Sequence, residues 1–209
     1  MPREEITLAL GLAVKRMLDI FIVILSCPIW IVVSILAAAG VWLTMGRPIF
    51  YKQWRPGLNG KCFEIIKFRT MVDKRDASGA PLPDKDRMTK FGRWLRSTSL
   101  DELPEIWNVI RNEMSLVGPR PLLTAYLARY NERQARRHEV RPGLTGLAQI
   151  KGRNSLSWTE KLEWDVRYVE TRDFWLDVKI LGSTVKMVIC RSGISAEGEA
   201  TMPEFNGSD

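Results

Sequence analysis

The sequence predicts an α+β protein that is mostly helical and has an N-terminal re-entrant membrane helix. Three observations predict it. No charged residue occurs between Asp19 and Arg47, so the segment 20–45 is apolar throughout. Two segments of alternating polarity flank a turn rich in Pro, Gly and Asn, which is typical of a small β-hairpin. Most of the remaining chain carries apolar and aromatic residues at helical spacing, which predicts several amphipathic interfacial helices.

The apolar segment 20–45 is long enough to enter a membrane deeply. As one helix it would span about 39 Å at about 1.5 Å per residue, against about 30 Å of hydrocarbon. Pro28 removes one helical hydrogen bond and predicts a kink. Basic residues flank both ends of the segment, so their distribution does not show which end faces the cytoplasm. We therefore predict a helix that bends at Pro28 and returns to the same face, with a single span as the alternative.

The next segments predict a compact catalytic region. The predicted strands are 49–53 and 62–70, joined by a turn at 55–60. A polar loop follows at 73–90, and a second loop covers 140–148. The predicted helices are 91–97, 103–112, 123–139, 158–171 and 174–190. The expected domains are a membrane helix with basic flanks (1–48), a cytosolic catalytic domain with interfacial helices (49–193) and a C-terminal tail (194–209).

Charge and residue counts restrict the partners and the metal. A formal charge of +7 indicates an anionic partner such as a nucleotide, a nucleic acid or a phospholipid surface. Three widely spaced cysteines give neither a disulfide framework nor zinc spacing. His138 is the only histidine, which excludes a site with several histidine ligands. A metal held by carboxylate oxygens is therefore expected to be Mg²⁺.

The adjacent acids Asp101 and Glu102 are the leading candidates for chemistry. They stand just before Pro104 and an apolar run, so we expect them at a helix N-terminus, where the helix dipole stabilises negative charge. Ordinary capping is the alternative. Basic residues beside turns favour a diphosphate partner, because loops commonly carry phosphate ligands and the arginine fork binds two oxygens. These residues are Lys67, Arg69, Arg96, Arg120, Arg141 and Arg153.

Together these features indicate phosphoryl transfer at a membrane surface. No Walker motif is present, so a P-loop nucleotide enzyme is not supported. The motifs that carry a family resemblance run in order along nearly the whole chain. They are Lys15-Arg16 with Asp19, the Pro28 break, Arg55-Pro56-Gly57, Lys67-Phe68-Arg69-Thr70-Met71, Ser99-Leu100-Asp101-Glu102-Leu103-Pro104, Asn108-Val109, Met114-Ser115, Gly118-Pro119-Arg120-Pro121, Arg141-Pro142-Gly143-Leu144-Thr145-Gly146 and Gly152-Arg153-Asn154.

With these motifs the chain resembles the bacterial monotopic phosphoglycosyl transferases, also called bacterial sugar transferases, in their minimal form. The resemblance implies that Asp101 attacks the sugar-bearing phosphate of a UDP-sugar and releases UMP. Polyprenol (undecaprenyl) phosphate then takes the phosphosugar from Asp101. Glu102 would help Asp101 to hold Mg²⁺, and Lys67, Arg120 and Arg153 would offset the repulsion between carboxylate and phosphate. Asp165 would assist at the substrate site.

The resemblance also implies where the membrane helix breaks, where the protein lies in the cell and which sugar it transfers. The family often has Ser directly before the helix-breaking Pro, where this chain has Cys27. We assign the break to Ser26, Cys27 and Pro28, with Ser26 available as the stronger hydrogen-bond donor. The implied location is the cytoplasmic face of the bacterial inner membrane, among membrane lipids, with both termini cytoplasmic. The tail, with Phe205-Asn206-Gly207, resembles members that transfer N,N'-diacetylbacillosamine 1-phosphate, so we expect an N-acetylated amino sugar.

Two other functions fit parts of the sequence. In the first, the acids only bind Mg²⁺ and the lipid phosphate attacks the UDP-sugar directly in a ternary complex. In the second, the chain is a non-enzymatic membrane-tethered binder of anionic ligands. The second is disfavoured for nucleic acid, because the basic residues lie around one acid pair instead of forming a continuous stripe with aromatic residues. We therefore expect no nucleic-acid partner.

Overall fold

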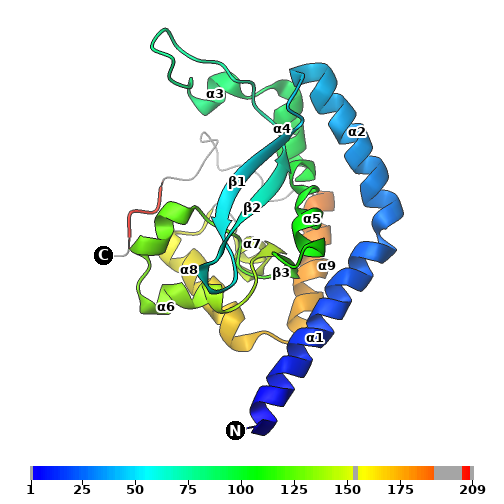
Figure 1. The fold of residues 1–209 in the computed structure, drawn as a ribbon, viewed down its shortest axis with the longest axis vertical. Coiled ribbons are helices and arrows are strands. Elements are labelled where there is room, and N and C mark those ends of the chain that lie inside the picture. Colours follow the sequence, from blue (N-terminus) through cyan, green and yellow to red (C-terminus); the bar gives the residue numbers. More distant parts are fainter. Residues whose placement is uncertain (1, 153–154, 191–203, 208–209) are drawn as a thin grey trace.

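Two long N-terminal helices run along one side of the protein. A computed structural model describes residues 2–152, 155–190 and 204–207, with α1 at Pro2–Leu25 and α2 at Cys27–Met45. Figure 1 shows the two helices following one another beside the rest of the chain, with a clear change of direction between them. Among the described residues, only α2 is long and apolar enough to cross a membrane, and 11% of its apolar window is buried. The predicted apolar helix is therefore present, with most of its surface uncovered.

The interruption between α1 and α2 falls at Ser26. The Ser26 hydroxyl donates to the carbonyl of Ile22 at 2.7 Å, and the indole of Trp30 donates to the carbonyl of Val23 at 3.0 Å. Pro28 lies in the first turn of α2, where a missing backbone N–H costs least. The two side-chain hydrogen bonds satisfy polar groups at a point where the apolar segment has few other partners.

The predicted hairpin is confirmed. Strands β1 (Phe50–Pro56) and β2 (Cys62–Phe68) pair antiparallel, from Phe50 opposite Phe68 to Pro56 opposite Cys62. The first strand continues beyond its predicted end because pairing extends to the turn. That turn is a 3₁₀ helix, η1 (Leu58–Gly60), with Asn59 at φ 53° and Gly60 at φ 72°. These left-handed conformations favour Asn and Gly.

A second sheet was not predicted. Strands β3 (Ser115–Val117) and β4 (Gly143–Thr145) pair in parallel, and α7 (Leu147–Lys151) follows. The prediction of a loop over 140–148 is therefore wrong. Three-residue strands carry too few positions for an alternating pattern. The backbones meet closely, because a Cβ on Gly143 would lie 2.1 Å from the amide nitrogen of Gly118.

The helices of the catalytic region agree with the predictions in part. The predicted helices at 158–171 and 174–190 are confirmed as α8 (Trp158–Thr171) and α9 (Phe174–Cys190). Helix α4 covers Lys90–Ser97, and the loop before it contains the one-turn helix α3 (Asp84–Arg87). The prediction of one helix over 123–139 is wrong. It is replaced by η3 (Thr124–Arg129), α6 (Glu132–Ala135) and η4 (Arg136–Glu139).

The break in that region has a local cause. The Asn131 side chain accepts a hydrogen bond from the backbone N–H of Gln134, and the Gln134 side chain accepts one from the backbone of Asn131. This capping box pairs backbone groups that a helix start leaves without partners, so a new helix begins here. Asn131 is therefore a helix start within a segment whose apolar spacing resembles that of a single helix.

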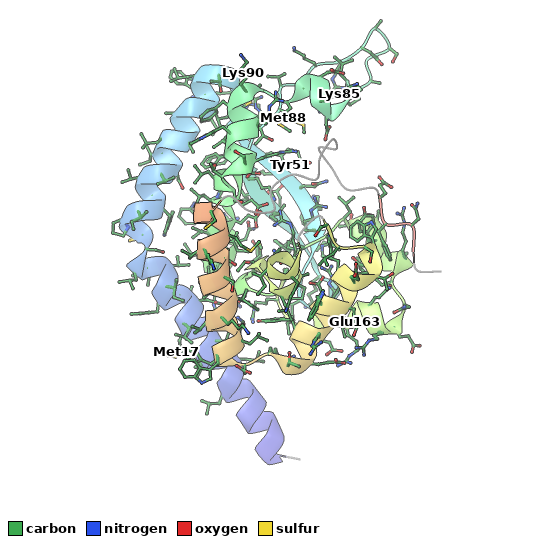
Figure 2. The ribbon with its side chains drawn as sticks, turned by 180° about the vertical axis from the view of Figure 1, so that it is seen from behind. Met17, Tyr51, Lys85, Met88, Lys90 and Glu163 are labelled. Atoms are coloured by element: carbon green, nitrogen blue, oxygen red, sulfur yellow. The ribbon has the colours of Figure 1, made fainter. Side chains whose placement is uncertain are left out.

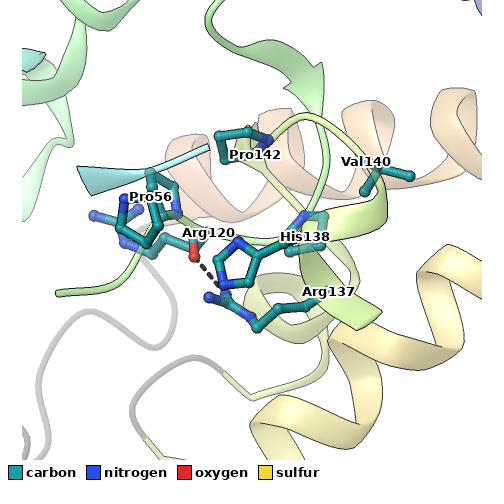
Figure 3. Close-up of a pocket in the computed structure, with 8 residues that line it drawn as sticks. Pro56, Arg120, Arg137, His138, Val140 and Pro142 are labelled. Carbon is teal, nitrogen blue, oxygen red and sulfur yellow. Dashed lines mark hydrogen bonds between the residues drawn. The ribbon is translucent and has the colours of Figure 1, made fainter. Parts of the chain in front are cut away.

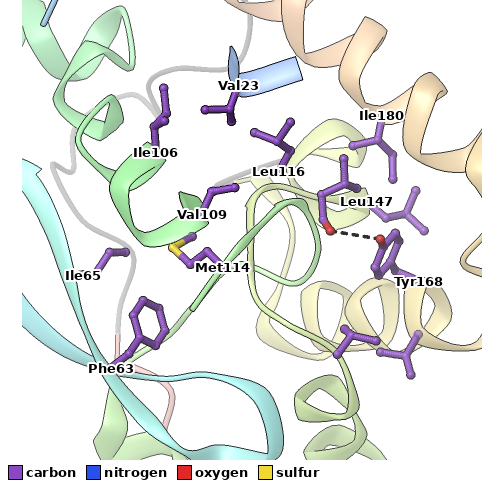
Figure 4. Close-up of a cluster of buried hydrophobic side chains, with 13 residues drawn as sticks. Val23, Phe63, Ile65, Ile106, Val109, Met114, Leu116, Leu147, Tyr168 and Ile180 are labelled. Carbon is purple, nitrogen blue, oxygen red and sulfur yellow. Dashed lines mark hydrogen bonds between the residues drawn. The ribbon is translucent and has the colours of Figure 1, made fainter. Parts of the chain in front are cut away.

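The main hydrophobic core joins the small sheets to α5 (Glu105–Ile110), α8 and α9. Figure 4 shows Ile65, Val109, Met114 and Tyr168 within it. The Tyr168 hydroxyl donates to the carbonyl of Val117 at 3.1 Å, which satisfies the one polar group of that ring. The core therefore fixes α5, and with it the acid pair that precedes this helix.

A smaller cluster holds the C-terminal tail. Phe205 is 2% exposed and packs with Tyr126, Tyr130 and Trp158. The guanidinium of Arg129 donates to the carbonyl of Phe205. Residues 204–207 of the tail therefore dock against the folded part of the chain.

Candidate active site

The acid pair lies in a tight turn between two helices. After α4 ends, Ser99 adopts a left-handed conformation (φ 56°), and η2 (Leu100–Glu102) places Asp101 and Glu102 before α5. The expectation that both acids occupy a helix N-terminus needs correction. They form a separate 3₁₀ turn, and Pro104 is the N-cap of α5. The left-handed residue and Pro104 favour two short elements over one continuous helix.

Helix α5 is tied to the hairpin by one buried side chain. Asn108 is fully buried. Its oxygen accepts from the backbone N–H of Ile66 at 3.2 Å, and its amide nitrogen donates to the carbonyl of Glu64 at 2.8 Å. These bonds hold the turn that carries the acids beside β2, the strand that carries Lys67. The chain thereby brings a cation and the acid pair together from segments 34 residues apart (101 − 67).

The Glu102 carboxylate forms ion pairs with two cations. The Lys67 Nζ lies 2.7 Å from its Oε1, and Arg120 donates to both carboxylate oxygens, with Nη1 at 3.1 Å from Oε2. Burial would raise the pKa of Glu102, but the charges of Arg120 and Lys67 outweigh it and hold that pKa well below its usual range. Glu102 is therefore ionised, and its two-point bond with the guanidinium fixes the Arg120 side chain.

Asp101 is in a different electrostatic state from its neighbour. Its side chain is 8% exposed, and no described group forms a hydrogen bond or ion pair with its carboxylate. Burial and then the charge of Glu102 raise the pKa of Asp101 to about 6, while Lys67, Arg96 and Arg120 act in the opposite direction. Asp101 is thus mostly ionised at neutral pH, and it has no bonded partner among the described residues. Both properties suit a nucleophile.

A third carboxylate, Glu105, was not predicted. It is 1% exposed, and its Oε1 lies 3.0 Å from the Nζ of Lys67. Burial raises its pKa to about 7, although the charge of Lys67 opposes this. Lys67 therefore lies between Glu102 and Glu105. No short motif indicated this residue, because its importance comes from burial and from its contact with Lys67.

The other predicted basic residues fall into two groups. Arg96 belongs to the site, because its charge lowers the pKa of Asp101 and its Nε donates to the Thr70 hydroxyl at 3.1 Å. Arg69 instead donates to carbonyls at the end of α2, including that of Gly46 at 2.8 Å. Arg141 donates to the carbonyl of Asn112 at 3.1 Å, beyond the C-terminal end of α5. The charges with the largest effects on the pKa of Asp101 include neither Arg69 nor Arg141. Arg153 lies outside the described residues.

Asp165 acts on the site through Arg137. Both side chains are buried, with the Arg137 Nη2 at 2.8 Å and Nε at 3.1 Å from the Asp165 Oδ2. The same Nη2 donates to the backbone carbonyl of Arg120 at 2.6 Å, which is the dashed line in Figure 3. Arg137 was not among the predicted site residues, because its burial depends on packing that no short motif shows.

His138 also borders this region and stays neutral. Its Nδ1 lies 3.3 Å from the carbonyl of Gly57, and burial, with the neighbouring charge of Arg137, lowers its pKa to about 4. Figure 3 shows it beside Arg137 and Arg120. A neutral histidine in this position contributes to packing around Arg120 and adds no positive charge to the site.

The carboxylates are compatible with one predicted metal, Mg²⁺. Within the described ranges no group of three His, Cys, Asp or Glu side chains could hold a metal alone. Mg²⁺ commonly uses one or two carboxylates and takes its other oxygens from water and substrate phosphates. The neighbouring residues Asp101 and Glu102 could supply two carboxylates of that kind.

A family model described as bacterial sugar transferase matches residues 10–191. The chain belongs to the bacterial sugar transferase family. The predicted membership is thereby confirmed, and with it the assignment as a transferase.

Several relatives of this bacterial sugar transferase are similar over most of its length. The uncharacterized sugar transferase EpsL of Bacillus subtilis is 50% identical over 93% of this chain and 96% of its own. The UDP-glucose:undecaprenyl-phosphate glucose-1-phosphate transferase of Caulobacter vibrioides is 38% identical over 84% of this chain and 69% of its own. The galactosyl transferase CpsE of Streptococcus agalactiae is 39% identical over 87% of this chain and 43% of its own.

Proposed function

We propose that the chain transfers a sugar 1-phosphate from a UDP-sugar to polyprenol (undecaprenyl) phosphate and releases UMP, as the first membrane step of glycoconjugate assembly. The observation that carries the proposal is the contrast within the acid pair. Glu102 is held by Lys67 and Arg120, while Asp101 has no bonded partner among the described residues. Sugar-phosphate transfer to undecaprenyl phosphate is also the reaction named for the Caulobacter relative.

The proposed reaction has two displacements at one phosphorus. An oxygen of Asp101 attacks the phosphorus that bears the sugar, and the bond from that phosphorus to the bridging oxygen breaks, so that UMP leaves with the electron pair. The phosphosugar is then an acyl phosphate on Asp101. An oxygen of polyprenol phosphate attacks the same phosphorus and breaks its bond to Asp101. The products are polyprenol diphosphate sugar and the restored carboxylate.

Positive side chains reduce the repulsion between the carboxylate and the phosphates. Lys67 and Arg120 lie within ion-pair distance of Glu102, and Arg96 acts on Asp101. Asp101 and Glu102 would hold Mg²⁺, which would neutralise charge on the diphosphate. With Glu102 as a metal ligand, Lys67 would keep Glu105 as its counter-ion, and Arg120 would be available to a phosphate oxygen. Roles for Arg69, Arg141 and Arg153 at the nucleotide sugar remain predictions.

The proposed location is the cytoplasmic face of the bacterial inner membrane, with both termini cytoplasmic and α1–α2 as a re-entrant helix. Large apolar side chains are exposed along α2, and also on α9 at Trp175 and on α4 at Trp94. These surfaces would lie in the membrane and its interface. Protease access to tags at residues 1 and 209 in sealed vesicles tests this topology. Termini on opposite sides would show a single span instead.

A panel of UDP-sugars would identify the sugar that this chain transfers. The tail motif predicts an N-acetylated amino sugar, whereas the two relatives with named sugars are a glucose-1-phosphate transferase and a galactosyl transferase. Mg²⁺-dependent UMP release with polyprenol phosphate is measured for UDP-glucose, UDP-galactose and UDP-N-acetyl sugars, including the diacetylbacillosamine donor. Selective turnover of one donor identifies the sugar. UMP release from none of them, at any acceptor concentration, would contradict the proposed function.

The covalent step is tested without acceptor. Protein incubated with a UDP-sugar that is labelled on the sugar-bearing phosphate should release one equivalent of UMP and retain the label, and Asp101→Asn should do neither. The matched control is Glu64→Gln, which alters an exposed carboxylate that pairs with Lys52. Full turnover with sequential kinetics and no retained label would favour direct attack by the lipid phosphate. Salt-sensitive RNA binding without UMP release would favour a binding protein.

A further inference from the structure

The face of the hairpin that carries Lys67 also carries a second cation, Arg55. In an antiparallel pair, residues opposite one another point to the same face, as do alternate residues of one strand. Tyr51 lies opposite Lys67, and Arg55 lies opposite Phe63. Phe63 is buried in the main core and Lys67 contacts the acids, so this face is turned toward the candidate active site. Figure 2 shows Tyr51 on the hairpin, near α4.

The side chain of Gln53 fixes the direction of Arg55. Gln53 lies between Tyr51 and Arg55 on the same face of β1. Its amide oxygen accepts a hydrogen bond from the Nη2 of Arg55 at 2.6 Å. Arg55 is four residues from Tyr51, which is about 13 Å along the strand at about 3.3 Å per residue. The hydrogen bond with Gln53 therefore turns the guanidinium toward the end of the hairpin that carries Lys67.

The positive charge of Arg55 is not balanced within the described part of the chain. Arg55 is half-buried, and no described carboxylate forms an ion pair with it. Its Nη1 is buried and has no hydrogen-bond partner. Burial lowers the pKa of Arg55, and the charge of Arg120 acts in the same direction, although Glu105 opposes it. Because a half-buried charge without a counter-ion is costly, this arrangement favours an anionic ligand.

Arg55 lies farther from the proposed nucleophile than Arg120 does. Pro56, the next residue in the chain, lines a small pocket with Arg120, and Figure 3 shows these two residues beside one another. The charges with the largest effects on the pKa of Asp101 include Arg120 but not Arg55. The sugar-bearing phosphate of a UDP-sugar has to reach Asp101. Its second phosphate would then lie beyond Arg120, on the side of Arg55.

We propose that Arg55 binds the nucleotide-side phosphate of the UDP-sugar, which leaves as UMP, and that Gln53 positions its guanidinium. The arginine fork suits phosphate oxygens, and a rotation of the side chain would bring the unpaired Nη1 to the ligand. The cation would offset the charge that develops on UMP as its bond to the sugar-bearing phosphorus breaks. The inference rests on the proposed function, because it assigns a residue to the donor of that reaction.

The test measures the binding of UMP and of uridine without turnover. Each ligand is titrated with the full chain in detergent micelles that contain Mg²⁺, and binding is followed by the nuclear magnetic resonance signals of the ligand. Arg55→Gln should weaken UMP binding by about 10- to 100-fold, as expected for charged hydrogen bonds. It should leave uridine binding unchanged, because uridine has no phosphate. Arg55→Lys should lose less affinity for UMP than Arg55→Gln, because the charge remains.

A second variant changes the surroundings of Arg55 and keeps the arginine. Gln53→Glu places a carboxylate at the atom that now accepts from Arg55, so it should neutralise the cation and also weaken UMP binding. The matched control is Lys52→Gln, which removes one charge from an exposed side chain of the same strand that pairs with Glu64. This control should bind both ligands as the wild type does.

Three results would overturn the inference. They are unchanged UMP affinity in Arg55→Gln, an equal loss of uridine binding in that variant, and an equal loss of UMP binding in Lys52→Gln. A raised KM for polyprenol phosphate in Arg55→Gln, with unchanged UMP affinity, would also overturn it, because the lipid phosphate would then be the ligand. UMP binding is measured without a sugar donor. Failed UMP release from every UDP-sugar would therefore reject the proposed transfer and leave this result standing.

Discussion

Arg137 donates a hydrogen bond of 2.6 Å to the backbone carbonyl of Arg120, and its own charge is balanced by buried Asp165. The Arg120 side chain in turn binds Glu102. A buried ion pair thus fixes the backbone from which a cation reaches the acid pair. Because removal of one member leaves the other charge buried and unpaired, this arrangement makes the site sensitive to residues that do not border Asp101.

Arg137→Lys should lower the turnover of UDP-sugar by up to about 100-fold, because lysine keeps the charge but cannot bond both Asp165 and the Arg120 carbonyl, and small misplacements of catalytic groups have effects of this size. UMP-release kinetics and the thermal unfolding midpoint are measured together. Arg136→Lys is the matched control on the neighbouring exposed residue. A loss of stability with unchanged turnover of the folded fraction would restrict Arg137 to a structural role.

The rate of the first displacement should rise with pH through about 6, because Asp101 attacks only when ionised and its pKa is raised to about 6. Below that pH the rate should fall about ten-fold per unit. Single-turnover UMP release between pH 5 and 8 gives the midpoint. A midpoint near 4 would contradict a raised pKa of Asp101 in the reacting complex.

Glu105→Gln should change how stability depends on pH. Burial raises the pKa of Glu105 to about 7 in the folded protein, so the folded state binds a proton more tightly than the unfolded chain does. This contribution to stability is complete below the unfolded pKa and is lost as pH rises through about 7. It amounts to roughly 1–3 kcal/mol. The wild type should therefore lose more stability than Glu105→Gln between pH 5 and 8, measured by thermal unfolding.

The matched control for that comparison is Glu64→Gln, whose carboxylate is exposed and pairs with Lys52. It should follow the wild type across the same range. Parallel curves for the wild type and Glu105→Gln would contradict a buried acid that titrates near neutral pH.

Phe205→Ala should release the C-terminal tail from its cluster. Phe205 is 2% exposed among three aromatic rings, and removal of a buried Phe costs about 3–5 kcal/mol where the chain stays docked. Detachment of the tail avoids most of that cost. Limited proteolysis should therefore remove the last residues of the variant much faster than those of Asn206→Ala. Equal cleavage rates would show that Phe205 does not hold the tail.

The sequence predicted the elements whose pattern extends over many residues. Helices α8 and α9 lie at their predicted bounds because their apolar spacing is long and their starts are marked by Ser157 and Asp173. The parallel pair β3–β4 was missed because three-residue strands leave no periodic pattern. The break at Asn131 was missed because tertiary contacts and a capping box override an apolar spacing that fits one helix.

Within the site, the residues that carry charge were easier to predict than the directions in which their side chains point. Asp101, Glu102, Lys67, Arg96 and Arg120 come together as expected. Arg69 and Arg141 carry the same charge but point to the carbonyl ends of helices. Such direction depends on where the helices end in space. Glu105 and Arg137 were missed because burial, which gives each its importance, is a property of packing and is not written in any short motif.

Lys67 pairs with Glu102 and Glu105, and Arg120 pairs with Glu102. These ion pairs predict how the binding of the nucleotide sugar depends on salt concentration. The cations that would receive the sugar-bearing phosphate already have carboxylate partners. Entry of a nucleotide sugar would exchange these partners and would displace few mobile ions from solution. The KM for the nucleotide should therefore vary less with ionic strength than affinity does in an open basic cleft, where release of counter-ions drives binding.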